Sequence, residues 1–125
     1  MHVGVMRLVL EIPGARSLKD KRQVVRSFVE RVRARLRVSI AEVGGHELLQ
    51  IAIFGVAVVS GDARVCQEQL ENVSAMAGSL PDALLVDRAT ELLPFGDGAE
   101  GVRGGIEQLS IGQRSDADGD AEEDS

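Results

Sequence analysis

Residues 51–60 are the segment that most constrains the fold, because they carry apolar side chains at odd and even positions alike. A strand with one face in water alternates apolar and polar residues, whereas a strand covered on both faces reads as a nearly continuous apolar run. Ser60, at the end of the segment, is its only polar side chain. We therefore expect residues 51–60 to form a central strand of a sheet.

A strand and a helix are expected at the start of the chain. Apolar side chains recur at every second position of residues 1–12, which is typical of a strand, and Pro13-Gly14 ends it. Residues 18–36 carry apolar side chains at helical spacing. Ser17 is a suitable N-cap for this helix, and Asp20 lies three residues further on, as in a capping box.

Three more elements complete the order. Residues 38–43 read as a second strand, directly before the turn that leads into the central strand. A second helix begins after Asp62 and ends before Pro81, and an extended segment follows within residues 83–93. The order βαββαβ is the split βαβ, ferredoxin-like pattern. We expect an α+β fold, with a four-stranded antiparallel sheet and two helices on one of its faces.

The second face of this sheet would be open, yet it is apolar. Val3, Val5 and Val9 of the first strand point to it, as do apolar side chains of the central strand. An exposed apolar patch of this size usually marks an interface. We predict a homodimer through the open face, with Val3, Val5 and Val9 in the interface. The alternative is that residues 88–95 cover the face.

The charges divide the chain into a domain and a tail. Residues 96–125 hold nine acidic residues against two basic ones, and seven of the fourteen glycines. They contain few apolar side chains, so they cannot bury enough surface to offset the entropy of ordering. We expect a ferredoxin-like domain over residues 1–95 and a disordered, acidic, Gly-rich tail over residues 96–125.

The first 37 residues are basic, although the whole chain has a net charge of −6. They hold ten Arg or Lys residues against three acidic ones. On a helical wheel of about 100° per residue, Lys19, Arg22, Arg26 and Arg33 share a sector of about 60° beside the apolar face. A stripe of positive charges with no acidic residue in the same sector is typical of a surface that binds the phosphate backbone of a nucleic acid. The alternative is that the stripe pairs with acidic groups of this chain or of a second copy. Four further bases flank the opposite edge of the apolar face, namely Lys21, Arg31, Arg35 and Arg37.

The loop before the helix could add an anion site. Gly14 lets the backbone approach a ligand closely, Arg16 brings a charge, and Ser17 brings a hydroxyl beside the helix N-terminus. A phosphate group would fit this combination. The alternative is ordinary helix capping, in which the chain itself satisfies Ser17.

Catalytic and metal-binding patterns are absent from the sequence. His2 and His46 have no partner at metal-ligand spacing, and Cys66 falls on the apolar side of the second helix, where an inert buried thiol is expected. We expect no enzyme activity, no cofactor and no metal. No apolar run is long enough to cross a bilayer, and a single Cys cannot form an internal disulfide, so we expect a cytoplasmic protein without a membrane partner.

Acylphosphatases share the split βαβ plan, and their chemistry needs an Arg in the first loop and an Asn that orients water. Arg16 has the right general placement. The only Asn of the chain, Asn72, falls inside the second helix, and the Gln-Gly-Val loop pattern of that family is missing. We therefore do not expect this activity.

The sequence resembles the YlxP-like family of small bacterial proteins of unknown function over about residues 1–93. The segments that carry the resemblance are Val3-Gly-Val with Arg7-Leu, Ile12-Pro with Arg16-Ser-Leu-Lys-Asp-Lys-Arg22, Val38-Ser-Ile-Ala-Glu-Val43, and Gly55-Val-Ala-Val-Val-Ser60. The resemblance implies a ferredoxin-like fold. It also implies genes near those for transcription antitermination, translation initiation and ribosome-binding factor A, and hence a role near RNA or the small ribosomal subunit. The acidic tail extends beyond the family's domain.

These observations predict a non-catalytic RNA- or ribosome-associated factor that binds phosphates through its basic first helix. Binding would be electrostatic rather than by base stacking, because Phe54 is the only aromatic residue in a predicted strand. A second hypothesis is a dimeric structural or regulatory module for protein interaction, without a nucleic-acid role. A third is a small enzyme or ligand-binding domain that uses Glu11 and the Gly14–Ser17 loop.

Overall fold

A computed structural model describes residues 1–96 and contains the six elements in the expected order. The elements are β1 (His2–Glu11), α1 (Leu18–Arg35), β2 (Ser39–Gly44), β3 (Ile51–Ser60), α2 (Ala63–Gly78) and β4 (Leu84–Pro94). Met1–Leu93 form one compact unit. The predicted tail lies outside the described residues except for Gly96, so its disorder stays a prediction.

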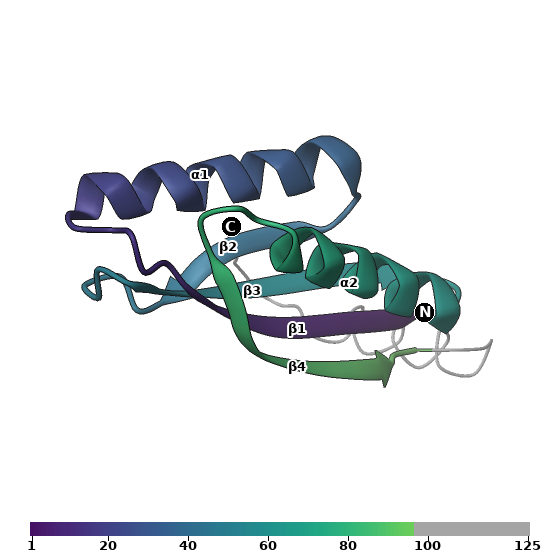
Figure 1. Cartoon of the computed structure of the whole chain (residues 1–125). Coiled ribbons are helices and arrows are strands. Elements are labelled where there is room, and N and C mark those ends of the chain that lie inside the picture. The colour runs from purple at the N-terminus through teal and green to yellow at the C-terminus, as the bar shows by residue number, and fades with distance from the viewer. Residues whose placement is uncertain (97–125) are drawn as a thin grey trace, which may run out of the picture. The chain divides into compact units, whose positions relative to one another are not determined.

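The strands form one antiparallel sheet in the order β2-β3-β1-β4, and both helices lie on the same face of it (Figure 1). This confirms the predicted ferredoxin-like fold. β3 and β1 are the two central strands, as predicted for residues 51–60. The helices cover only the even-numbered side of β3, so its odd-numbered apolar side chains lie on the open face of the sheet. Their register places Arg7 opposite Gly55 near the middle of the sheet.

The core lies between the sheet and the helices. Even-numbered residues of the central strands point into it, as the alternation predicted, and the two helices close it from above. Phe28 of α1 meets Phe54 of β3 edge to face, with ring centroids 5.2 Å apart. Apolar side chains that are fully buried here include Leu8, Leu10, Phe28, Val32, Phe54, Leu70 and Val73.

The start of α1 is fixed by two hydrogen bonds between side chains and the backbone. Ser17 Oγ accepts a hydrogen bond from Asp20 N at 3.1 Å, and Asp20 Oδ2 accepts one from Arg16 N at 3.0 Å. The first bond satisfies a backbone donor that the first helical turn would otherwise leave without a partner, so Ser17 is the N-cap as predicted. The second differs from a capping box, because Asp20 reaches Arg16 N, one residue before the N-cap, rather than Ser17 N.

The edge strand β4 is longer than the extended segment predicted from the sequence. Residues 88–94 lie within β4 at the edge of the sheet, beside β1. The alternative that this segment covers the open face is therefore wrong, because its backbone is used in the sheet. Among residues 1–96, no helix is both long enough and apolar enough to span a membrane.

Candidate nucleic-acid interface

The predicted basic stripe lies on the solvent side of α1. Lys19, Arg22, Arg26 and Arg33 are all exposed. Within residues 1–96, no acidic group forms an ion pair with Lys19, Arg22 or Arg26, and their side chains donate no hydrogen bond. Intramolecular neutralisation, the alternative raised by the sequence, therefore does not occur within the described part of the chain.

Arg33 locates the stripe relative to the sheet. Its Nη2 donates a hydrogen bond to the carbonyl oxygen of Ile40 at 2.9 Å. Ile40 belongs to β2, an edge strand, so the stripe runs along the flank of α1 that borders β2. An arginine has five N–H donors. This single bond therefore fixes the guanidinium and leaves donors for a ligand.

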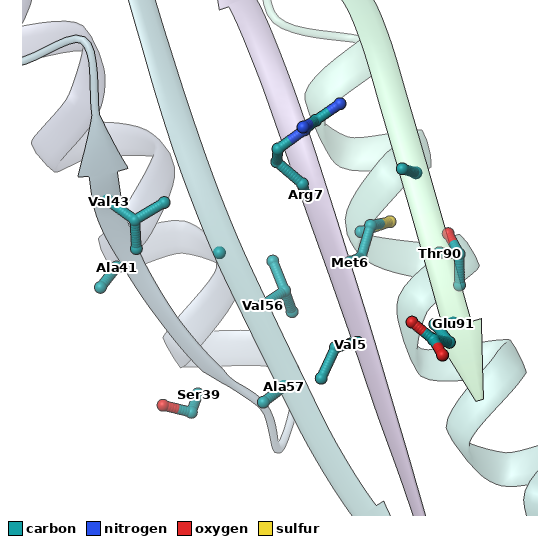
Figure 2. A pocket seen from close by; sticks show the side chains of 12 residues that line it. Val5, Met6, Arg7, Ser39, Ala41, Val43, Val56, Ala57, Thr90 and Glu91 are labelled. Atoms are coloured by element: carbon teal, nitrogen blue, oxygen red, sulfur yellow. The ribbon is translucent and has the colours of Figure 1, made fainter. Parts of the chain in front are cut away.

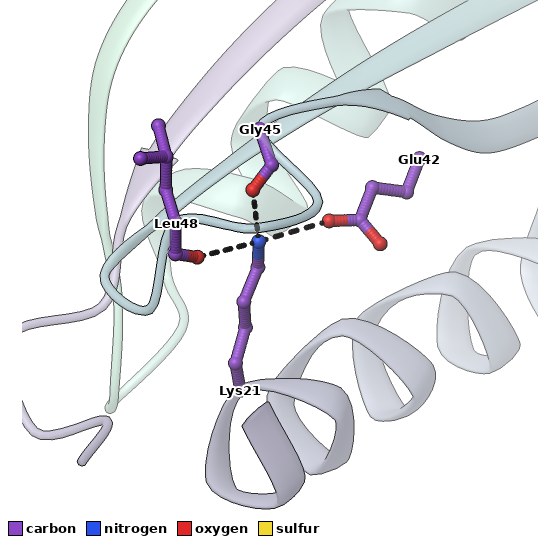
Figure 3. A network of polar contacts seen from close by, with 4 residues as sticks. All are labelled: Lys21, Glu42, Gly45 and Leu48. Carbon is purple, nitrogen blue, oxygen red and sulfur yellow. Dashed lines mark hydrogen bonds and ion pairs between the residues drawn. The ribbon is translucent and has the colours of Figure 1, made fainter. Parts of the chain in front are cut away.

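Lys21 is not one of the flanking surface bases that the sequence predicted. Lys21 is only 2% exposed, and its ammonium group points toward the β2–β3 turn (Figure 3). Nζ donates to the carbonyl oxygens of Gly45 at 2.6 Å and Leu48 at 2.8 Å. Glu42 Oε2 lies 3.1 Å from Nζ as an ion-pair partner, outside hydrogen-bond geometry. Burial of the charge is possible because three oxygens replace its water shell.

The position of Lys21 on the helical wheel could have revealed this burial. The same wheel places Lys21 between Phe28 and Val32, inside the apolar sector rather than beside it. A long basic side chain can reach from such a position to polar atoms beyond the core. Its partner Glu42, which belongs to the Ala41-Glu-Val43 segment quoted for the family resemblance, could not be assigned from the sequence pattern.

The loop that precedes α1 is held in place by hydrogen bonds from Gln50 to its backbone carbonyls. Gln50 Nε2 donates to the carbonyl oxygens of Pro13 and Ala15, at 3.0 and 3.2 Å, and Ile12 N donates to Gln50 O at 2.8 Å. Ser17 and the Asp20 carboxylate are engaged in the cap, which already places a negative charge at the helix N-terminus. The geometry thus favours the capping interpretation over a phosphate site at Gly14 and Ser17. The exposed side chain of Arg16 has no partner among residues 1–96 and remains available.

The open sheet face carries a shallow hollow of about 550 Å³ (Figure 2). Its lining includes the small residues Gly55, Ala41, Ala57 and Ala89. Arg7, opposite Gly55, turns toward β4, and its Nη2 forms an ion pair with Asp87 Oδ2 at 3.2 Å. The apolar side chains that surround the hollow or extend the face are Val3, Val5, Val9, Val43, Ile53 and Val59.

Of the residues considered for chemistry, His2 and Cys66 are in contact, through the backbone of His2. His46 is exposed in the β2–β3 turn, Cys66 is fully buried with Sγ 3.6 Å from the carbonyl oxygen of His2, and Asn72 is exposed on α2. Among residues 1–96, no three His, Cys, Asp or Glu side chains form a group that could hold a metal ion. Glu11 is half-buried in β1.

Sequence comparison identifies relatives of this chain. A family model described as "Protein of unknown function (DUF503)" matches residues 3–90. The "Uncharacterized protein YlxP" of Bacillus subtilis (strain 168) is 37% identical over 80 residues, which cover 64% of this chain and 87% of that protein.

Solved structures with a similar arrangement have low sequence identity to this chain. A REP-associated tyrosine transposase bound to a REP hairpin is 12% identical (TM-score 0.38), and the match covers 87% of this chain and 64% of that one. Rv0793 from Mycobacterium tuberculosis is 19% identical (TM-score 0.39; 79% and 99% covered). A dimeric ferredoxin-like protein of unknown function from Thermobifida fusca YX is 15% identical (TM-score 0.39; 74% and 92% covered).

Proposed function

The chain belongs to the DUF503 family, whose function is unknown, and we propose that it is a non-catalytic factor that binds RNA, alone or in the small ribosomal subunit. The proposed contact is the basic stripe of Lys19, Arg22, Arg26 and Arg33, with Arg16 beside it. The observation that carries the proposal is the absence of acidic partners for Lys19, Arg22 and Arg26 within residues 1–96.

The stripe differs from the cations that serve the fold. Arg7 and Lys21 each have a carboxylate partner, at 3.2 and 3.1 Å. By contrast, Lys19 and Arg22 are three residues apart, Arg22 and Arg26 four, and like charges at these spacings destabilise a helix by a few tenths of a kcal/mol per pair. A polyanion bound along the stripe would relieve this repulsion and release condensed counterions.

RNA binding through the basic stripe should show itself as an affinity that depends on the salt concentration. Phe28 and Phe54 are fully buried, so neither can stack on a base, and the exposed Phe95 follows β4, at the opposite edge of the sheet from β2. Affinity would then come from phosphate contacts, and it should fall steeply as the salt concentration rises. Sequence preference should be weak, because phosphates carry no base information.

The test replaces Lys19, Arg22 and Arg26 with Glu in the full chain. Arg33 is left in place because it also bonds to Ile40. The matched control, Arg31→Glu with Arg64→Glu and Arg88→Glu, makes the same charge change at exposed arginines outside the stripe. We expect the stripe variant to lose RNA binding and ribosome cosedimentation at low salt, and the control to retain both. Unchanged binding by the stripe variant, or equal loss in both, would contradict the proposal.

A second candidate function is favoured by the open sheet face, namely a dimeric module for protein interaction. The strands of the face contain 37 residues in total, which at about 3.3 Å per residue and 4.8 Å between strands gives roughly 600 Å² per protomer. Two such faces would bury about 1,200 Å², the lower end of the range for stable interfaces. A second copy supplies a matching apolar face, so we take it as the occupant.

The oligomeric state of the full chain tests this candidate. Val5→Lys puts a charge on the open face, and Val65→Lys puts one at an exposed valine of α2. We expect light scattering to find a dimer for the parent protein and for Val65→Lys, and a folded monomer for Val5→Lys. A monomeric parent protein at about 100 μM, well above the Kd of a stable dimer, would rule the dimer out.

A further inference from the structure

We propose that the basic stripe selects base-paired RNA over unpaired RNA, an inference that rests on the proposed function and names the ligand class of the same site. We draw it from the fixed helix that carries the stripe, from the length of the stripe and from the burial of Phe28 and Phe54. These properties decide whether the stripe favours an RNA whose phosphates already have fixed positions or one that becomes ordered only when it binds.

The stripe lies on a helix that is held to the rest of the domain near both ends, so the backbone positions of its basic residues form a fixed row. With a rise of about 1.5 Å per residue, Lys19 and Arg22 lie about 4.5 Å apart along the axis, Arg22 and Arg26 about 6 Å, and the row to Arg33 spans about 21 Å. The hydrogen bonds of Ser17 and Asp20 fix its first turn, and the bond from Arg33 to Ile40 O anchors its last one. Lys21 ties the same helix to the β2–β3 turn.

A row of basic side chains on a fixed helix is matched best by phosphates that are already in a fixed array. A duplex presents such an array, whereas a flexible strand has to be ordered when it binds, which reduces affinity. Proteins that bind single strands compensate by stacking bases on aromatic side chains. Among residues 1–96, Phe28 and Phe54 are fully buried against each other. The third aromatic residue, Phe95, is exposed, but it follows β4, which is the opposite edge of the sheet from β2, the strand that the stripe borders.

Counterion release acts in the same direction. Four phosphate contacts release about 3.6 ions from a B-form duplex and about 2.8 from a single strand. With the same coefficients for RNA and equal affinities at about 1 M salt, the difference of about 0.8 ion favours the duplex roughly tenfold at about 50 mM salt. Because the stripe contacts phosphates alone, two duplexes of different sequence should bind equally well.

The experiment compares two RNAs with the same number of phosphates, a perfect hairpin and an oligouridine that does not pair. Binding of the full chain is measured by fluorescence anisotropy over a range of salt concentrations. We expect the hairpin to bind about tenfold more tightly at about 50 mM salt and with a steeper salt dependence. The Lys19→Glu, Arg22→Glu, Arg26→Glu variant should lose the hairpin affinity, and the Arg31→Glu, Arg64→Glu, Arg88→Glu control should keep the preference.

The outcomes separate the inference from the function on which it rests. Equal or tighter binding of the oligouridine, lost in the stripe variant, overturns the duplex preference and leaves RNA binding by the stripe intact. Binding of neither RNA overturns both. Hairpin binding that survives in the stripe variant also overturns both, because the contact would then lie elsewhere on the protein.

Discussion

Lys19 and Lys21 lie two residues apart on the same helix and have opposite surroundings. Lys21 is buried, with its ammonium 2.6 to 3.1 Å from three oxygens of the β2–β3 region (Figure 3). Lys19 is exposed and has no partner among residues 1–96. The two lysines therefore show that angular position on the helix, and not residue type, separates cations that hold the fold together from cations that are available to a ligand.

Arg33 lies between these extremes. It is exposed as a residue, yet one of its nitrogens bonds to Ile40 O. Its charge can reach a ligand while the same side chain ties α1 to the edge strand β2. From Lys21 through Arg33 to Lys19, the contribution of the side chain to stability should decrease. Arg33 and Lys19 should contribute to RNA binding, and Lys21 should not.

The largest effect on stability is expected for Lys21→Ala. The change leaves the Glu42 carboxylate and two carbonyl oxygens without their cation, which should lower the free energy of unfolding by about 3 kcal/mol. For a domain of this size, such a loss lowers Tm by about 15 °C. Circular dichroism during thermal unfolding measures the shift. A loss below about 1 kcal/mol would mean that Lys21 contributes no more than an exposed ion pair.

An intermediate effect is expected for Arg33→Ala. Loss of the bond to Ile40 O should lower the free energy of unfolding by about 1 kcal/mol. Removal of the charge should also reduce the slope of log K against log salt by about one unit. Thermal unfolding and RNA titrations at several salt concentrations measure the two effects. Arg33→Lys keeps the cation and serves as the control, since it should preserve the salt slope.

The smallest effect on stability is expected for Lys19→Ala. A cation in the first helical turn opposes the helix dipole, so its removal should leave stability unchanged or raise it by a few tenths of a kcal/mol. The salt slope of RNA binding should still fall by about one unit. If this variant instead destabilised the fold as Lys21→Ala does, the distinction between the two sides of the helix would fail.

The parts of the fold that the sequence predicted are those set by local signals. The alternation of residues 1–12 and the apolar run at 51–60 placed the two central strands, and Ser17 with Asp20 placed the start of α1. β4 was recognised only in part, because residues 86–91 of this edge strand are all exposed and polar and apolar residues do not alternate strictly there. When both faces of a strand are exposed, apolar and polar residues need not alternate, and the prediction of a strand depends on that alternation.

The candidate site was predictable to the extent that a helical wheel describes it. The wheel placed Lys19, Arg22 and Arg26 in the stripe correctly on the exposed side. It does not show what lies opposite the helix, so the partners of Lys21 and Arg33 on β2 and its turn were missed. The hollow at Gly55 was missed for the same reason, since it depends on the register between β1 and β3.

One ammonium group links α1 to both ends of the β2–β3 turn. Because Lys21 Nζ bonds to the carbonyls of Gly45 and Leu48, the turn cannot open without stripping a buried charge of its partners. The first turn of α1 and the β2–β3 hairpin should therefore unfold together as one cooperative unit. In native-state hydrogen exchange, the amide of Leu48, bonded to Gly45 O at 2.9 Å, and that of Lys21, bonded to Ser17 O at 3.1 Å, should exchange with the same opening free energy.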